Sequence, residues 1–465
     1  MHPSDESPFA FERHGDAVAL ICADSTLSYG ALGRAVAESA QGIGADDLVA
    51  VVAAADVASL VAYLACQRVG RPVLLVDAQL PAERRLDLYD RYQVSVVFDG
   101  QWRRLRPTGP QTHPELSLLL STSGSTGAPK MVRLSRAAVH ANASAIARYL
   151  SLRADDVAIT SLPFHYSYGL SVVHSHLLVG GSIVVADLAV TQREFWELVR
   201  SRKVSNLAGV PVIYEWMRRL RVERMELPAL RMLTQAGGRL APDLVRWWAE
   251  AAGKKGWEFF VMYGQTEATA RMAYLPPQLA AHHSDAIGLP IPGGAFALVG
   301  EGGEILEGSD QEGELVFTGV NVMMGYAMEA ADLARGDELG GVLHTGDIAA
   351  RDSSGVYRIV GRKSRFLKVF GKRLALDHLE ALLAERGLTV VVTGRDDFLI
   401  VVADDVRTAD AAAVAVCDLA GLHRSVVNSM TMNEIPRTSS GKLNYAEIIA
   451  TFDRRRQEMH TTGQL

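Results

Sequence analysis

Short apolar runs alternate with amphipathic stretches through the first half of this chain of 465 residues. The apolar runs have the length of buried strands, and the stretches between them carry apolar residues at helical spacing. In the first 100 residues the pattern predicts strands over 49–53, 72–76 and 94–98 and helices over 57–69 and 81–92. Between 136 and 200 it predicts helices over 136–149, 170–179 and 192–200 and strands over 159–162 and 182–185. Such alternation predicts an α/β fold with a mostly parallel sheet.

The pattern changes at about Gly288, where glycine and short apolar runs become dominant. We expect a small β-rich subdomain there, with strands over 295–299, 303–306 and 314–318 and a hairpin turn at 352–355. A domain boundary is expected near Gly361. The region after it predicts helices over 377–386 and 408–419 and strands over 389–393 and 398–403. The expected organisation is a large N-terminal domain of α/β subdomains, residues 1–360, and a small α+β domain, residues 361–465.

Composition narrows the class of protein. The chain is 48% hydrophobic and 22% charged with a formal net charge of -6, which indicates a globular protein and argues against nucleic-acid or membrane-surface binding. The most apolar stretch near the start, residues 48–66, is interrupted by Asp56 and predicts a strand and a buried helix rather than a membrane span. The three cysteines are far apart, and residues 1–12 are polar, unlike a signal peptide. We therefore expect a cytoplasmic protein.

The segment 121–130 has the sequence Ser-Thr-Ser-Gly-Ser-Thr-Gly-Ala-Pro-Lys and follows the apolar run 116–120. Its backbone N–H groups, hydroxyls and the cation of Lys130 suit a phosphate. It does not fit the common P-loop pattern, because the glycines and the lysine are wrongly spaced. A flexible polar linker has the same composition, so this loop alone leaves both interpretations open.

Four further segments follow in order: Tyr263–Glu267, His344–Asp347, Gly361–Lys363 and Pro436–Lys442. Together with the loop, and at these separations, they resemble the adenylate-forming superfamily of acyl- and aryl-CoA synthetases, peptide-synthetase adenylation domains and luciferases. Weaker similarities at 26–32, 313–315 and 325–326 extend the resemblance over nearly the whole chain. Within the superfamily the chain is most like a stand-alone, AMP-forming acyl-CoA synthetase.

The resemblance implies that a carboxylate attacks the α-phosphate of ATP and that pyrophosphate leaves, with Mg²⁺ balancing the phosphate charge. Glu267 would hold Mg²⁺, Thr266 would contact the α-phosphate, and Lys130 would support the loop or contact phosphate. Lys442 would be the catalytic lysine on a mobile C-terminal domain. The phosphate grip would come from Thr122, Ser123, Gly124, Ser125, Thr126 and Gly127.

The nucleoside would be bound by a second group of residues. Asp347 would accept the ribose hydroxyls, and Arg362 would assist at the ribose or phosphate. Tyr263, which is followed by Gly264 and Gln265 in the motif, would stack on adenine. Gly237 and Gly238 match the place where the superfamily lays its backbone against adenine, although an ordinary turn remains an alternative for these two glycines.

The acid pocket is expected to be lined from residues 162–170, 208–214 and 236–238. The expected pocket residues are His165, Tyr166, Tyr168, Gly209 and Val210. His165 is either a gate or polar lining, and a structural histidine is an equal alternative. No Phe-Asp pair of the kind that anchors an α-amino group occurs in the first segment, so a simple acid with an apolar or aromatic body is expected.

The chain ends about twenty residues after Lys442, so we expect an external thiol as acceptor: coenzyme A or the phosphopantetheine arm of a separate carrier protein. The expected hinge, residues 362–365, has Ser364 where the superfamily usually has Asp or Lys. This departure keeps open an enzyme that makes only the adenylate and hands it to a partner. A non-catalytic nucleotide-binding protein is a third alternative, although Thr266, Glu267 and Lys442 are all present.

Overall fold

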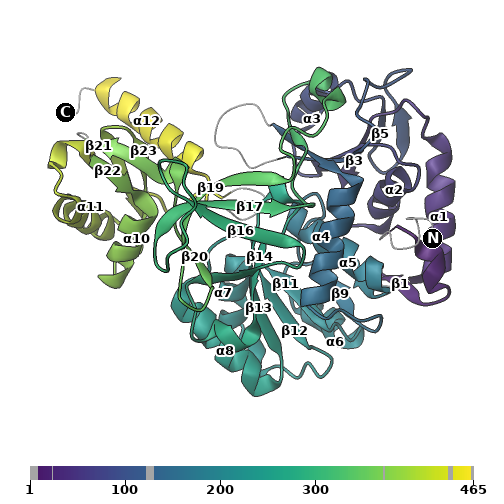
Figure 1. The fold of residues 1–465 in the computed structure, drawn as a ribbon, viewed down its shortest axis with the longest axis horizontal. Coiled ribbons are helices and arrows are strands. Elements are labelled where there is room, and N and C mark those ends of the chain that lie inside the picture. The colour runs from purple at the N-terminus through teal and green to yellow at the C-terminus, as the bar shows by residue number, and fades with distance from the viewer. Residues whose placement is uncertain (1–8, 23–24, 122–129, 370–371, 438–442, 462–465) are drawn as a thin grey trace. The chain divides into compact units, whose positions relative to one another are not determined.

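The computed structural model describes residues 9–22, 25–121, 130–369, 372–437 and 443–461 (Figure 1). Its contacts divide the chain into two compact units. Of the described residues, the first unit holds 9–22, 25–121, 130–296 and 317–343, and the second holds 297–316 and 344 onward. The boundary expected near residue 361 stays a prediction.

The first unit contains a seven-stranded sheet with the order β18-β8-β7-β4-β3-β5-β6. Its strands β7, β4, β3 and β5 are parallel, as the alternating pattern predicts, and β18, β8 and β6 are antiparallel additions. The bounds are β3 Val49–Ala53, β4 Val73–Asp77, β5 Val96–Phe98, β6 Trp102–Arg104, β7 Leu116–Ser121, β8 Met131–Ser135 and β18 Gly325–Ala327.

A second sheet of the first unit runs in the order β15-β14-β13-β12-β11-β9-β10-β1-β2. Strands β13, β12, β11, β9, β10 and β1 are parallel, so their carboxyl ends lie at one edge. The bounds are β1 Val18–Ile21, β2 Thr26–Ser28, β9 Val157–Ile159, β10 Ser182–Val184, β11 Asn206–Gly209, β12 Met232–Gln235, β13 Glu258–Tyr263, β14 Ala273–Leu275 and β15 Ala286–Pro290.

Helices α4 and α5 pack against each other, with α4 on β7 and β8 of the first sheet and α5 on β9 and β10 of the second. Helices α7 and α8 pack on β11 and β13. The helix bounds are α1 Tyr29–Ser39, α2 Val57–Arg68, α3 Ala82–Arg91, α4 Arg136–Tyr149, α5 Ser167–Val179, α6 Arg193–Ser201, α7 Pro211–Arg219, α8 Pro242–Lys255 and α9 Pro277–Ala280.

Asp56 shows why the apolar stretch 48–66 is a strand and a helix. Its carboxylate accepts a hydrogen bond of 2.7 Å from the backbone N–H of Ser59 and caps α2. Helix α2 is buried around most of its circumference, which explains its nearly uniform apolar sequence. No helix in the described part of the chain is long and apolar enough to cross a membrane.

The second unit begins with the strand order β16-β17-β19-β20 and continues into a compact C-terminal region. There β21 pairs with β22, and the sheet β23-β24-β25 has α10 and α11 on one face and α12 on the other. The bounds are β16 Gly294–Val299, β17 Glu312–Gly319, β19 Val342–Arg351, β20 Tyr357–Arg362, β21 Phe366–Val369, β22 Lys372–Ala375, α10 Leu376–Glu385, β23 Val391–Arg395, β24 Phe398–Ala403, α11 Val406–Ala420, β25 Val427–Thr431 and α12 Tyr445–Thr461.

Two expectations for the β-rich region had different outcomes. The hairpin turn at 352–355 is confirmed, because Asp352 accepts from the N–H of Gly355 between β19 and β20. The strand expected over 303–306 is wrong. Gly303 has φ +88° and closes a tight turn against Gly300, which leaves only an isolated bridge between Val299 and Ile305.

Candidate active site

The phosphate-type loop connects β7 to β8. Ser121 at the end of β7 pairs with Met131 at the start of β8, so the two ends of the loop are held side by side. Lys130 lies at the described end of the loop. The six residues expected to grip phosphate, from Thr122 to Gly127, lie outside the described residues, and their roles stay predictions.

Lys130, Tyr326 and Glu267 form a chain of contacts. The Nζ of Lys130 lies 3.7 Å from the centre of the Tyr326 ring, and the Tyr326 hydroxyl donates a hydrogen bond of 2.7 Å to Oε1 of Glu267. Burial and the neighbouring Glu267 carboxylate raise the pKa of Tyr326, which therefore stays a donor. The structure thus joins the expected loop lysine to the expected Mg²⁺ ligand.

The donor set around Glu267 fits a magnesium ion that is bound mainly through a nucleotide. With one carboxylate oxygen held by Tyr326, the other oxygen can still coordinate a cation. The described residues contain no group of three acidic, His or Cys side chains that could hold a metal alone. Mg²⁺ at nucleotide sites commonly uses one or two carboxylates together with phosphate oxygens and water.

Glu267 lies on a turn whose backbone is under strain. Thr269 and Ala270 have φ values of 62° and 147°, which non-glycine residues rarely adopt. Asn321 holds the turn, since its amide donates to the carbonyl oxygens of Ala268 and Arg271 at 2.8 and 3.0 Å. The backbone N–H of Met323 also donates to the carbonyl oxygen of Glu267, at 2.8 Å. The carboxylate therefore projects from a fixed piece of backbone.

Gly264 is required by the same turn. A Cβ at this position would lie 1.7 Å from the carbonyl oxygen of Ala270, so only glycine permits the close approach. Two residues further on, the Thr266 hydroxyl lies 3.3 Å from that of Ser167, the first residue of α5. Thr266 is therefore close to the positive end of a helix dipole, a favourable place for an anion.

The carboxyl ends of three parallel strands bring other predicted residues together. Gly209 ends β11 opposite Gln235 of β12, and Gln235 lies opposite Val261 of β13. Gly237 follows β12 with φ +84°, and a Cβ there would lie 2.6 Å from the Tyr166 hydroxyl and 2.9 Å from Val210. Ligands of open α/β sheets bind at this edge. Tyr166, Val210 and Gly237 are thus in contact, beside Gly209, Gly238 and Tyr263.

His165 and Tyr168 differ in their surroundings. His165 has Nε2 3.6 Å from the Asp77 carboxylate and a buried Nδ1 that has no hydrogen-bond partner among the described residues. Burial lowers the pKa of His165, and Asp77 opposes this only in part. Tyr168 is fully buried, and its hydroxyl donates to the Thr234 carbonyl oxygen at 2.7 Å. The Nδ1 atom of His165 therefore stays unpaired among the described residues, whereas Tyr168 is held in the core by its hydrogen bond to Thr234.

Asp347 and Arg362 are brought together in the second unit. They pair across β19 and β20, and Nε of Arg362 lies 2.8 Å from the Asp347 carboxylate. Beside them Glu314 binds Lys363 at 2.7 Å and His344 at 3.1 Å. Burial favours a higher pKa for Glu314, but these two hydrogen bonds hold the pKa below its ordinary value. Lys442 lies outside the described residues, and its role stays a prediction.

The profile of the AMP-binding enzyme family matches residues 9–118 and 99–327 of the chain. The chain belongs to this family. The expected membership of the adenylate-forming superfamily is thereby confirmed. All residues that form the edge around Gly209, Gly237 and Glu267 lie within the matched region.

Curated relatives of this AMP-binding enzyme include acid–CoA ligases. The chain is 29% identical to the indoleacetate–CoA ligase of Aromatoleum aromaticum over 74% of its own length and 68% of that protein. It is 29% identical to the oxalate–CoA ligase of Arabidopsis thaliana over 58% of its length, which spans about half (53%) of that relative. The names of both relatives agree with the expected enzyme class.

Among solved structures, the chain resembles the o-succinylbenzoate–CoA synthetase of Bacillus subtilis in complex with ATP and magnesium. The TM-score is 0.78 at 18% identity, over 95% of this chain and 99% of that one. The likeness confirms the expected fold class, with α/β subdomains, a β-rich part and a small C-terminal part.

Several residues of the AMP-binding enzyme's site were not predicted as site residues. Tyr326 lies in a segment with only weak similarity, and nothing in the sequence places it against Glu267, 59 positions away. Asp77 ends an ordinary buried strand. Ser167 and Arg271 are close to predicted positions, but only the folded structure shows what they contact.

Proposed function

We propose that this AMP-binding enzyme uses ATP and Mg²⁺ to convert a carboxylic acid to an acyl-adenylate, releases pyrophosphate, and transfers the acyl group to the thiol of coenzyme A. The observation that carries the proposal is the chain Lys130–Tyr326–Glu267 beside the carboxyl ends of β11, β12 and β13. It combines a fixed carboxylate and a cation at the edge where a nucleotide is expected.

Each step requires charge to be held in place. Glu267 would hold Mg²⁺ through the carboxylate oxygen that Tyr326 does not bind, and a bound Mg²⁺ would supply positive charge to the phosphates of ATP. Thr266 donates its hydroxyl to the α-phosphate, close to the start of α5. The ammonium group of Lys130 lies at the C-terminal end of the loop, next to β8. Catalysis is then mainly positioning and electrostatic stabilisation.

The second unit completes the reaction in this proposal. Asp347 and Arg362 bind the ribose and phosphate, and Lys442 bridges the carboxylate and α-phosphate. We assign residues 361–465 to a small domain that changes orientation between adenylation and thioester formation. The place of action is the cytoplasm, where ATP and coenzyme A are available.

The names of the relatives do not identify the acid that this enzyme activates. Indoleacetate has one carboxylate on an aromatic body, whereas oxalate has two carboxylates and no body. The expected apolar or aromatic acid agrees with the first name. His165, with its open Nδ1, and the apolar residues beside it suit such a body at the near end of the pocket.

The test is pyrophosphate release from ATP and Mg²⁺ with a panel of fatty, aryl, dicarboxylic and amino acids, with and without coenzyme A. We expect one acid class to release pyrophosphate and to yield a thioester when coenzyme A is present. Pyrophosphate release without a thioester would show that the acceptor is the phosphopantetheine arm of a separate carrier or another partner. No acid-dependent pyrophosphate release would contradict the proposal.

A further inference from the structure

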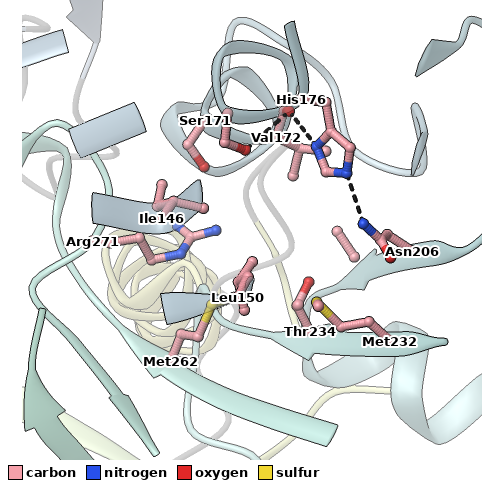
Figure 2. Close-up of a pocket in the computed structure, with 12 residues that line it drawn as sticks. Ile146, Leu150, Ser171, Val172, His176, Asn206, Met232, Thr234, Met262 and Arg271 are labelled. Atoms are coloured by element: carbon pink, nitrogen blue, oxygen red, sulfur yellow. Dashed lines mark hydrogen bonds between the residues drawn. The ribbon is translucent and has the colours of Figure 1, made fainter. Parts of the chain in front are cut away.

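A small cavity lies inside the first unit, next to the predicted acid pocket. It has a volume of about 20 Å³, and its lining includes Ser171, Asn206, Ala208, Thr234, Met262 and Arg271 (Figure 2). A space of this size accepts one small polar group. Ala208 precedes Gly209, and Thr234 precedes Gly237 by three residues, so the cavity lies close to residues of the predicted pocket along β11 and β12.

Arg271 is the unusual member of this lining. Its side chain is buried, with the whole residue 2% exposed, and the structure shows no ion pair for it within the described residues. Its Nε has no hydrogen-bond partner among the described residues, although the guanidinium does hydrogen-bond the Tyr149 side chain. Figure 2 shows the guanidinium directed into the space between Ser171, Leu150 and Thr234. A buried cation without a carboxylate partner is costly, and such groups in native proteins need an explanation.

Arg133, in the same unit, is a buried arginine whose guanidinium has a carboxylate partner. It is also fully buried, but its guanidinium binds the Glu338 carboxylate at 2.8 Å and the carbonyl oxygen of Met324 at 3.2 Å. Arg271 instead has its Cζ 3.9 Å from the centre of the Tyr168 ring. A cation–π contact offsets only part of the cost of burying the charge. The Nε–H of Arg271 has no partner among the described residues, and it is the donor that a ligand can take.

The backbone of Arg271 is fixed before any ligand arrives. Its carbonyl oxygen accepts hydrogen bonds of 3.0 Å from the side-chain amides of both Asn142 and Asn321. Arg271 ends the strained turn that begins after Glu267. The same rigid turn therefore positions the expected magnesium ligand and the cation of the cavity, so the two groups have a set separation.

The other ionisable group of the cavity does not add charge. His176 has Nδ1 2.8 Å from the carbonyl oxygen of Val172 and Nε2 2.8 Å from the amide of Asn206. Only a neutral ring can donate to the carbonyl and accept from the amide. Burial also lowers the pKa of His176. The positive charge of the cavity is therefore that of Arg271.

We propose that Arg271 binds a second carboxylate, at the end of the substrate opposite the reacting carboxylate, so that the acid is a dicarboxylic acid. This inference rests on the proposed function. A guanidinium can bind a carboxylate through two parallel hydrogen bonds.

The test compares straight-chain dicarboxylic acids of graded length with monocarboxylic acids of equal length, in acid-dependent pyrophosphate release. The proteins are the wild type, Arg271→Met and, as a matched control, Arg246→Met on the exposed face of α8. For one length, kcat/KM of the wild type should favour the dicarboxylic acid. Arg271→Met should lower kcat/KM for that acid by about tenfold to a hundredfold and leave the monocarboxylic acid nearly unchanged. Arg246→Met should match the wild type.

If the wild-type enzyme prefers the monocarboxylic acid at every chain length, this inference is overturned. The proposed function would stand, because an acid is still activated. Absence of pyrophosphate release with every acid would instead contradict the proposed function. Thermal unfolding of Arg271→Met shows whether the variant folds. If it does not, the wild-type length series decides, supported by Arg271→Lys, which keeps the charge but loses the paired hydrogen bonds and should retain only part of the preference.

Discussion

Tyr326 positions the Glu267 carboxylate, since its hydroxyl holds one oxygen at 2.7 Å while its ring faces Lys130. For Tyr326→Phe we expect kcat of adenylation to fall about tenfold and the Mg²⁺ requirement to rise, because partners that orient a metal ligand typically contribute ten- to a hundredfold. Steady-state pyrophosphate release at varied Mg²⁺ measures both effects. Tyr29→Phe is the control, since its hydroxyl donates to the carbonyl oxygen of Gly181 in the core. An unchanged Mg²⁺ requirement in Tyr326→Phe would contradict this role.

The sequence predicted single residues only where a motif surrounds them. Thr266 and Glu267 could be assigned because Tyr-Gly-Gln-Thr-Glu follows a clear strand. Arg271, four positions after Glu267, gave no sign of being buried, since arginine is usually exposed. Its burial results from long-range contacts with Asn142 and Tyr168, which no local pattern reveals.

The strained turn after β13 is the structural element that carries the site. We expect Gly264→Ala to destabilise the protein by about 1–3 kcal/mol or more and to abolish most adenylation, because the new Cβ would overlap the Ala270 carbonyl oxygen and displace Glu267. Gly253→Ala in α8 is the matched control. Its Cβ meets nothing within 4 Å, so helix propensity should raise stability by up to about 1 kcal/mol. Chemical denaturation and pyrophosphate release check both. A Gly264→Ala variant with normal stability and activity would contradict the role of the turn in positioning Glu267.

Helix α5 carries two buried neutral histidines, and it should make the protein sensitive to acid. Burial lowers the pKa of His174 to about 3 and also lowers that of His176. The unfolded chain binds these protons near pH 6.5, so stability is fully present above that pH and is lost as the pH falls toward 3. At pH 5 the contribution of His174 is a loss of about 2 kcal/mol.

Urea denaturation at pH 7 and pH 5 measures this loss. His174→Gln cannot be protonated and should lose about 2 kcal/mol less than the wild type between the two pH values. The exposed His282→Gln should behave like the wild type. If His174→Gln and the wild type lose the same free energy of unfolding between pH 7 and pH 5, His174 of α5 is not the cause of the acid sensitivity.

The elements themselves were largely predictable, with bounds shifted by a few residues. Helix α4 matches its expected range, and β3 and β24 match theirs, because strong periodicity and caps such as Ser135 mark their ends. The strand expected over 303–306 failed because its glycines favour a tight turn over sheet pairing. Sheet order did not follow from the pattern, since it depends on long-range packing.

At the scale of the whole molecule, the proposed change of orientation needs a pivot. Lys363 is bound to Glu314 on β17, whereas Arg365 is bound to Asp377 and Glu380 on α10. The two neighbours of Ser364 are thus anchored to different elements. We expect Ser364→Pro to change the ratio of thioester formation to adenylate formation at least tenfold, because proline restricts the backbone at this point. Single-turnover assays of each half-reaction, with Ser354→Pro in the β19–β20 turn as control, measure the ratio. An unchanged ratio would place the pivot elsewhere.

The central claim is that the acid's carboxylate attacks the α-phosphate of ATP. The direct test is to supply an accepted acid labelled with ¹⁸O in its carboxylate, together with ATP, Mg²⁺ and coenzyme A, and to analyse the products by mass spectrometry. We expect AMP that carries one ¹⁸O atom and unlabelled pyrophosphate. Label in inorganic phosphate, with ADP as the nucleotide product, would mean attack at the γ-phosphate and would contradict the account.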